Sequence, residues 1–151
     1  MREKTIEKKL VIAIKEAGGI APKFVSPGFD GMPDRIVLLP GGHMGFVEVK
    51  APGKVPRPLQ EARHRMLRRL GCKVYVLDRP EQIIQILEDT HRVVAENILG
   101  RRLNADEVVH HVDGNPRNND PDNIRVFPSQ KEHAEFHAKL HAFFIRGGDA
   151  K

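Results

Sequence analysis

The first half of this sequence is organised around residues 31–50, which read GMPDRIVLLPGGHMGFVEVK. β-Branched and aliphatic residues at 35–39 and 45–49 predict two short strands, and the Pro-Gly-Gly between them predicts the turn of a β-hairpin. Asp34 then stands at the start of one strand, while Glu48 and Lys50, two residues apart, share a face of the other. We therefore expect two carboxylates and an ammonium group to converge.

Two converging carboxylates repel each other, and proteins commonly hold them together with a shared proton or a hard divalent cation such as Mg²⁺. A lysine beside such a cation can orient an attacking water and offset the charge that grows on a phosphate. A solvated strand on which Glu48 and Lys50 form a simple charge pair fits the same spacing. The hairpin alone leaves a hydrolytic site and a charged strand both open.

The composition indicates a globular chain of one ordinary domain or two small ones, with 151 residues and 40% hydrophobic content. No run of about 18 apolar residues predicts a membrane span, and the charged and apolar blocks of a secretory signal are absent. Cys72 is the sole cysteine, which excludes an internal disulfide and a thiolate zinc knuckle. We expect a cytoplasmic protein without a membrane partner.

Charge and histidine are unevenly distributed along the chain. The net charge of +5 and the pI near 9.6 favour a polyanionic partner. Residues 1–88 carry a formal charge of +6 and residues 89–151 a charge of −1, whereas six of the eight histidines lie in the last 61 residues. This shift predicts two modules, 1–88 and 89–151, with the boundary near Asp89.

Periodicity predicts the elements around the hairpin in the first module. They are a helix over 5–17, an irregular loop over 20–33 with a short strand near 23–26, a helix over 58–70, a strand over 73–77 and a helix over 80–87. The apolar face of the second helix is expected to comprise Leu59, Ala62, Met66, Leu67 and Leu70. Glu7 lies in the apolar arc of the first helix, where a first-turn position or a functional role would each explain a carboxylate. Gln60, taken alone, fits an ordinary surface residue, although it could reach the carboxylate cluster.

Four pieces of the first module, in this order, resemble the PD-(D/E)xK nucleases of the VRR-NUC (virus-type replication-repair nuclease) family. They are Glu7, Gly31-Met32-Pro33-Asp34, Glu48-Val49-Lys50 and Gln60, and the likeness covers about residues 1–88. The resemblance implies a restriction-endonuclease-like α/β (α+β) fold, in which helices flank a mixed central sheet.

The same resemblance implies a Mg²⁺ or Mn²⁺ site formed by Glu7, Asp34, Glu48 and the carbonyl of Val49. Lys50 would stand at the attacking water, and Gln60 would support the site. Similar nucleases act on branched DNA and dimerise, so duplex or branched DNA and a homodimer are the expected partners. The basic residues expected to contact DNA are Lys54, Arg57, Arg63, Arg65, Arg68, Arg69, Arg101 and Arg102.

The second module is expected to hold a helix over 90–99, a short strand within 107–115, a second strand over 124–127 and a capped helix from 129 to about 145. Spacings of four residues put His133, His137 and His141 on one face of the last helix. Its buried side is expected to hold Phe136, Leu140, Phe143 and Phe144. We expect His133 and His137, facing a strand that ends in His110-His111, to bind a metal. His43, His64, His91 and His141 are expected to be ordinary surface histidines.

This pattern of strand, loop, strand and helix resembles the HNH endonucleases of the ββα-metal fold over about residues 92–141. The matching residues are Leu99-Gly100-Arg101, Glu107, Val109-His110-His111, Asp113-Gly114-Asn115, Asn119, Asn123-Ile124, His133 and His137. The resemblance implies that His110, His133 and His137 hold one divalent metal, Mg²⁺, Mn²⁺ or Zn²⁺. It also implies that His111 is the general base and that Asn123 braces the loop positioning it.

The leading hypothesis is a metal-dependent DNA endonuclease of a bacterial or phage-infected cell, structure-selective through its first module and with a second HNH nicking-type site. A second hypothesis keeps one site active and makes the other module a DNA-binding scaffold. A third is a non-enzymatic DNA-binding protein in which three imidazoles hold structural Zn²⁺. Lys50 and His111, neither of them a metal ligand, favour the enzymatic hypotheses.

Overall fold

The computed structural model describes residues 1–146, except for the side chains of Phe144 and Arg146. Two sheets are present, one with the strand order β1-β2-β3 and a smaller one formed by β4 and β5. The elements in chain order are α1 (Glu3–Glu16), β1 (Arg35–Leu39), η1 (Pro40–Gly42), β2 (His43–Val49), α2 (Pro58–Arg69), β3 (Lys73–Leu77), η2 (Pro80–Gln82), α3 (Ile83–Leu99), β4 (Val108–His111), η3 (Pro121–Asn123), β5 (Ile124–Phe127) and α4 (Gln130–Arg146). No helix within 1–146 is long and apolar enough to cross a membrane.

The predicted hairpin is formed by β1 and β2, which run antiparallel with Arg35 opposite Val47. β2 begins two residues earlier than expected, and η1 makes the turn. Gly41 and Gly42 in this turn have φ of 76° and 78°, a left-handed conformation that favours glycine. β3 then pairs with β2 in parallel, with Glu48 opposite Val76. The sheet is therefore mixed, as the sequence predicts.

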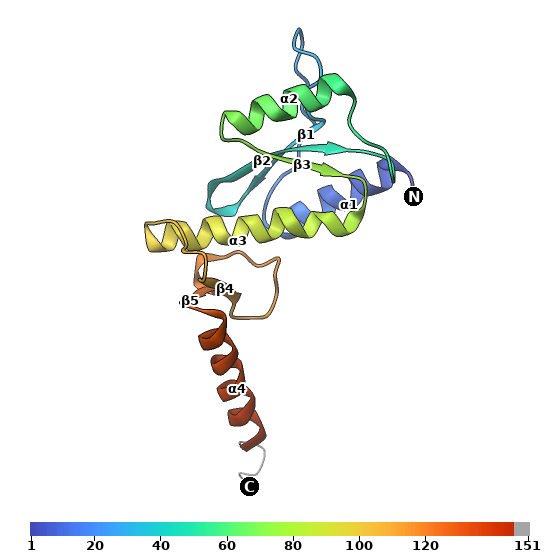
Figure 1. The fold of residues 1–151 in the computed structure, drawn as a ribbon. Coiled ribbons are helices and arrows are strands. Elements are labelled where there is room, and N and C mark those ends of the chain that lie inside the picture. Colours follow the sequence, from blue (N-terminus) through green and yellow to red (C-terminus); the bar gives the residue numbers. More distant parts are fainter. Residues whose placement is uncertain (147–151) are drawn as a thin grey trace.

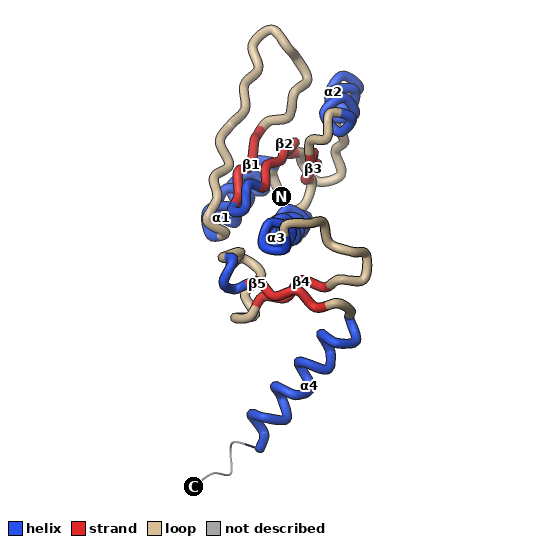
Figure 2. The backbone as a smooth tube through the Cα atoms, turned by 90° about the vertical axis from the view of Figure 1, so that its left-hand side faces the viewer, coloured by secondary structure: helices blue, strands red, loops and turns tan. Residues whose placement is uncertain are grey.

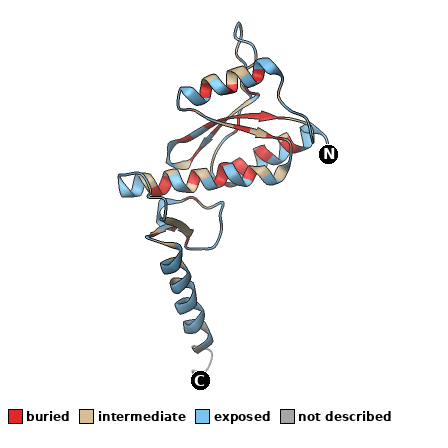
Figure 3. Ribbon diagram, in the orientation of Figure 1, coloured by how far each residue is buried: buried red, intermediate tan, exposed pale blue. Residues whose placement is uncertain are grey.

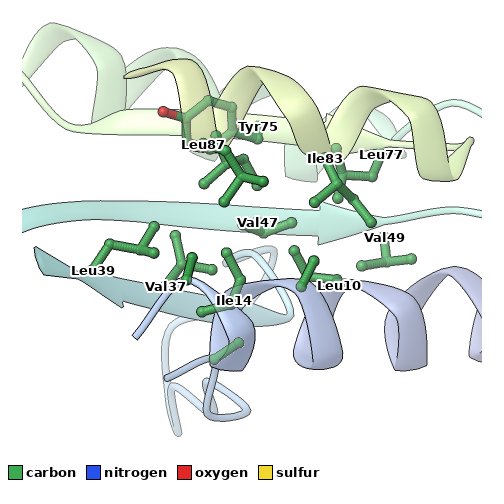
Figure 4. Packing of buried hydrophobic residues seen from close by; sticks show 14 of the residues in the cluster. Leu10, Ile14, Val37, Leu39, Val47, Val49, Tyr75, Leu77, Ile83 and Leu87 are labelled. Carbon is green, nitrogen blue, oxygen red and sulfur yellow. The ribbon is translucent and has the colours of Figure 1, made fainter. Parts of the chain in front are cut away.

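One face of this sheet forms the apolar core. Val37, Val47 and Leu77 pack with α1 and α3, as Figure 4 shows. Leu10 and Ile14 of α1 are 0% exposed in this cluster, and burying each such side chain contributes about 1.5–3 kcal/mol. Figure 3 shows the buried residues concentrated in the larger sheet and the helices beside it. Hydrophobic burial therefore fixes α1 and α3 on this side.

The other face of the sheet is covered by α2, whose orientation differs from the prediction. Its buried residues are Gln60, His64 and Leu67, whereas Leu59 and Leu70 are 48% and 72% exposed. The expected apolar stripe is therefore wrong for Leu59 and Leu70, whereas Leu67 is buried and Ala62 and Met66 are half-buried. The physical reason is that this face of the sheet carries the buried carboxylate of Glu48, so the helix turns polar side chains toward it.

Two local predictions near the N-terminus also differ from the structure. Because α1 begins at Glu3, Glu7 lies in its second turn, beyond the positions where the helix dipole most favours an acid. No strand forms at 23–26, where an isolated bridge joins Lys23 to Arg35 instead. Figure 2 shows this part of the chain as a long loop that projects from the larger sheet.

The two helices predicted at 80–87 and 90–99 are one continuous helix, α3, preceded by η2. The change of charge near Asp89 is not accompanied by glycine or proline, so nothing in the sequence breaks the helix there. Thr90 is 0% exposed and its hydroxyl donates to the carbonyl of Ile86 at 2.7 Å. α3 contacts η1 and β2 on one side and β4 and β5 on the other. The predicted boundary therefore lies inside a helix that both halves share.

β4, β5 and α4 form the predicted strand, strand and helix of the second half. The strands pair antiparallel with His111 opposite Ile124, and Phe127 packs on Phe136 with ring centroids 5.2 Å apart. Figure 1 shows α4 running away from the rest of the molecule. The expected buried side of α4 is therefore wrong beyond its first turns, because Leu140 and Phe143 are 43% and 73% exposed. The expectation for Phe144 lies outside the described side chains.

A Glu88→Pro substitution tests the continuity of α3. Proline removes the backbone N–H of this exposed position and clashes with the preceding turn, so we expect a loss of about 3 kcal/mol. Thermal unfolding followed by circular dichroism measures the change, with Glu88→Ala as the matched control. If position 88 were a flexible boundary between independent domains, the proline variant would unfold at the same temperature as the control.

Candidate active sites

The first candidate site lies at the end of the hairpin where β1 starts and β2 finishes. The pairing of Arg35 with Val47 puts Asp34, the preceding residue, opposite Glu48. Glu48 is 0% exposed and Asp34 is exposed. The backbone N–H of Val49 donates to Oδ2 of Asp34 at 3.1 Å, which ties the two strands together. The structure therefore brings the two carboxylates of the hairpin to one place.

Lys50 and Gln60 both bind the same oxygen of the Glu48 carboxylate. The ammonium of Lys50 forms an ion pair with Oε1, and Nε2 of Gln60 donates to Oε1 at 2.6 Å. Oε1 of Gln60 accepts from the backbone N–H of Arg57 at 2.9 Å, which fixes the amide at the start of α2. Gln60 is therefore a buried partner of the carboxylate and not the surface residue that its spacing alone suggests.

The environment of Glu48 raises its pKa. Burial is the largest cause, the hydrogen bond from Lys50 opposes it, and the negative charge of Asp34 adds to the rise. Oε2 of Glu48 is buried and has no hydrogen-bond partner among residues 1–146. A carboxylate in this state gains from a nearby cation. The oxygen donors of Asp34 and Glu48 are those that Mg²⁺ and Mn²⁺ prefer, so these residues fit such a metal.

Glu7 is engaged elsewhere. Its Oε1 forms an ion pair with the guanidinium of Arg35 at 3.0 Å. Within residues 1–146, Glu7, Asp34 and Glu48 are not among the groups whose ligand atoms lie within 4.8 Å of one another. The structure thus assembles the site around Asp34, Glu48, Lys50 and Gln60, and the metal-ligand roles of Glu7 and of the Val49 carbonyl stay predictions.

His64 is a residue of this site that sequence reasoning missed. Its side chain is 3% exposed, and its Nε2 lies 3.8 Å from Oε2 of Glu48. Burial lowers the pKa of His64, and the charges of Arg68 and Lys50 lower it further. The signal in the sequence was its position four residues after Gln60, which puts both side chains on one face of α2.

The basic residues expected to contact DNA fall into two groups. Three of them form hydrogen bonds to other groups of the protein. Nε of Arg63 donates to the carbonyl of Asp30 at 2.9 Å, Arg68 donates to the carbonyl of Val74 at 3.0 Å, and Arg101 binds the Glu107 carboxylate through two nitrogens at 2.6 and 2.8 Å. The other five, Lys54, Arg57, Arg65, Arg69 and Arg102, are exposed, and so are Arg68 and Arg101.

The second candidate site is a cluster of three imidazoles from β4 and α4. Nδ1 of His110 lies 3.0 Å from Nε2 of His133, which lies 3.1 Å from Nε2 of His137. Among residues 1–146 these three form the group able to hold a metal ion, with ligand atoms within 4.8 Å of one another. Burial lowers the pKa of His110 and of His133, and the neighbouring imidazoles add to both shifts. Neutral nitrogens facing one another fit a transition metal such as Zn²⁺.

His111 faces away from this cluster. Neighbouring residues of a strand point to opposite faces, and the His111 ring packs on His91 of α3 with centroids 5.1 Å apart. Its Nε2 lies 3.0 Å from Oδ1 of Asn119, and it is 8% exposed. His91 and Asn119 are therefore neighbours of the expected base to which sequence reasoning gave no role. Nothing in the spacing of the sequence points to His91, because it comes from a different element.

Asn123 holds the loop between β4 and β5. Its Nδ2 donates to Oδ1 of Asp113 at 2.9 Å and to the carbonyl of Asn118 at 2.8 Å. Its Oδ1 accepts from the backbone N–H of Asp113 at 2.9 Å. These contacts fix the chain that follows His111, and the role of Asn123 in positioning that base stays a prediction.

Three comparisons with known proteins agree with this architecture. Residues 88–134 match a family model described as HNH endonuclease. The protein named "Putative nuclease p44" of Acyrthosiphon pisum secondary endosymbiont phage 1 is 55% identical over 78 residues, which span 52% of this chain and 84% of that protein. A solved structure titled "VRR_NUC domain" is similar with a TM-score of 0.54 and 30% sequence identity, covering 58% of this chain and 97% of that one.

The likenesses correspond to the two candidate sites. The HNH match includes β4, β5 and the start of α4 with His133, and the solved VRR_NUC domain has the restriction-endonuclease-like fold expected for the larger sheet and its helices. The relative named as a nuclease is matched over most of its length. The chain therefore belongs to the VRR-NUC nucleases and carries an HNH endonuclease domain fused to the nuclease domain.

Proposed function

We propose that this protein is a metal-dependent DNA endonuclease whose principal site is built around Asp34, Glu48 and Lys50. The observation that carries the proposal is the Glu48 carboxylate, 0% exposed and bound by both Lys50 and Gln60. A buried carboxylate without functional use is unfavourable, and an apolar residue would serve packing better. Phosphodiester hydrolysis needs a cation, a positioned water and a positive group near the phosphate. Asp34 and Glu48 would hold the cation, and Lys50 would supply the positive group and position the water.

At this site Asp34 and Glu48 would hold Mg²⁺ or Mn²⁺, with Glu7 and the Val49 carbonyl as further proposed ligands. The cation would supply Lewis-acid activation of the phosphate and of water. Lys50 offsets negative charge at the reacting phosphate and orients the nucleophile. Gln60 keeps Oε1 of Glu48 oriented, and its own carbonyl is fixed by the Arg57 backbone. Arg65 and Arg69, both exposed on α2, contact the DNA backbone.

The imidazole cluster is proposed as a second, nicking-type site. His110, His133 and His137 would hold one divalent metal, and its charge would stabilise the phosphate. His111 is the proposed general base. The contact of its Nε2 with Oδ1 of Asn119 favours a proton on Nε2 and leaves Nδ1 to accept one from water. The proposal extends to two domains, 1–88 and 89–151, to branched DNA as substrate and to a homodimer.

A second candidate function for the C-terminal half is a zinc-stabilised DNA-binding module. The observation that favours it is the orientation of His111, whose ring packs against α3 on the face opposite the imidazole cluster. In that case the metal would hold α4 on the small sheet and the first site alone would cut DNA.

Substitution of Lys50 tests the principal site. Lys50→Met removes the charge beside the phosphate, and we expect cleavage of labelled duplex, flap and four-way-junction DNA to fall by roughly 10²–10⁴-fold in Mg²⁺ or Mn²⁺. Lys15→Met, at an exposed lysine near the end of α1, is the matched control. His111→Ala should remove a different product if the second site cuts. Unchanged cleavage by Lys50→Met on every substrate would assign the first domain a scaffold role.

Metal addition tests the imidazole cluster. Ligand binding to the folded state at 100 times Kd stabilises it by about 2.7 kcal/mol, so Zn²⁺ should raise Tm by roughly 5–10 °C. His133→Ala should abolish this rise. His141→Ala, on the exposed part of the same helix, should leave it intact. A rise that persists in His133→Ala would show that the ion binds elsewhere.

Glu48→Gln, measured in the presence of EDTA, tests how far the buried charge of Glu48 destabilises the folded protein. Because burial raises the pKa of Glu48 in the folded state, the folded protein binds the proton more tightly than the unfolded chain. Stability should therefore fall as the pH rises above the ordinary carboxyl range. We expect Glu48→Gln to have a Tm a few degrees above wild type at pH 8, with the gap closing toward pH 4. Glu61→Gln on exposed α2 surface is the control, and an equal Tm at both pH values would contradict the prediction.

A further inference from the structure

Glu48 and His64 each contain a buried polar atom that has no hydrogen-bond partner within the described residues. The atoms are Oε2 of Glu48 and Nε2 of His64. They lie 3.8 Å apart, and the two side chains are 0% and 3% exposed. Buried polar groups are nearly always paired, because an unpaired donor or acceptor pays its full desolvation cost. Two such atoms facing each other indicate a shared role.

We propose that His64 is a positioning residue for the metal-binding carboxylate of Glu48, with its proton on Nε2 directed at Oε2. This inference rests on the proposed metal-dependent function of the first site. Lys50 and Gln60 both occupy Oε1, so His64 is the group left to orient the second oxygen. Hydrogen bonds of this kind fix the rotation of a ligating carboxylate and tune its affinity for metal.

The geometry of α2 supports this assignment. Gln60 and His64 are four residues apart, so one face of one helix directs a side chain toward each oxygen of the same carboxylate. The 3.8 Å separation is longer than a hydrogen bond, and catalytic contacts often tighten to bonding distance once the ligands are bound. Burial and the charges of Arg68 and Lys50 lower the pKa of His64, so they oppose a doubly protonated ring beside Glu48.

The alternative is that His64 only fills space between α2 and the sheet. An imidazole and a phenyl ring have similar shapes, so a space-filling role predicts that phenylalanine replaces His64 without loss. A positioning role predicts instead that glutamine, which carries an N–H donor at similar reach, is the better substitute. The pair His64→Phe and His64→Gln therefore separates volume from hydrogen bonding.

Mn²⁺ affinity is the direct measurement. The full chain carrying His133→Ala, which disables the imidazole cluster, is titrated with Mn²⁺ and the free ion is followed by electron paramagnetic resonance. We expect His64→Phe to weaken binding by roughly 10–100-fold, the usual cost of removing a residue that orients a ligand, and His64→Gln to recover most of the affinity. Equal affinity of His64→Phe and the parent, or equal losses in both variants, would overturn the role of His64.

The tautomer of His64 in the wild-type protein is a second measurement that does not depend on the variants folding. Long-range ¹H–¹⁵N spectra identify which ring nitrogen carries the proton, and the expected result is a proton on Nε2. A proton on Nδ1 alone would overturn the proposal. If the parent chain did not bind Mn²⁺, the metal role of the first site would be overturned instead. The positioning role of His64 would then fall with it, whichever tautomer is found.

Discussion

The buried charge of Glu48 is the constraint on which the first half of the molecule depends. Ionised carboxylates are costly inside proteins unless other groups compensate them. Lys50, the residue after β2, and Gln60 of α2 both bind this carboxylate and compensate its charge. These contacts explain why α2 turns its polar side toward the sheet and leaves Leu59 exposed. The arrangement gives less apolar packing than a hydrophobic residue would, but it places a carboxylate where a bound cation can neutralise its charge. Such a compromise between stability and activity is common.

A second constraint is the continuity of α3, which joins the two halves. Ile83 and Leu87 of this helix belong to the core of the larger sheet, whereas His91 packs on His111 of the smaller one. Near its end, Nδ2 of Asn97 donates to the carbonyl of Gly41 at 2.6 Å. Outside the helix, an ion pair of 2.8 Å joins Arg117 to Glu16. The two candidate sites are therefore joined through α3 and these contacts.

The sequence predicts the parts of the fold that depend on local chemistry. The hairpin follows from two β-branched runs around Gly41, and the strand at Lys73–Leu77 follows from its own composition. Features decided by tertiary contacts were missed. The apolar pattern of α2 did not predict the burial of Gln60 and His64, because this pattern alone does not show that the sheet opposite carries a carboxylate. The change of charge near Asp89 does not interrupt α3, because helix formation responds to glycine and proline and not to net charge, and the domain boundary there stays a prediction.

The same distinction separates the two sites. The Gly-x-Pro-Asp and Glu-x-Lys motifs lie on paired strands, and the register of the hairpin alone suffices to bring Asp34 to Glu48. His111 lies beside His110 on one strand, so alternation sends the two imidazoles to opposite faces of the strand. The first site is assembled by the fold itself, with a buried acid, a lysine and an amide already in contact. In the second site the imidazoles of His110, His133 and His137 lie in contact, whereas the ring of His111 packs on His91 of α3.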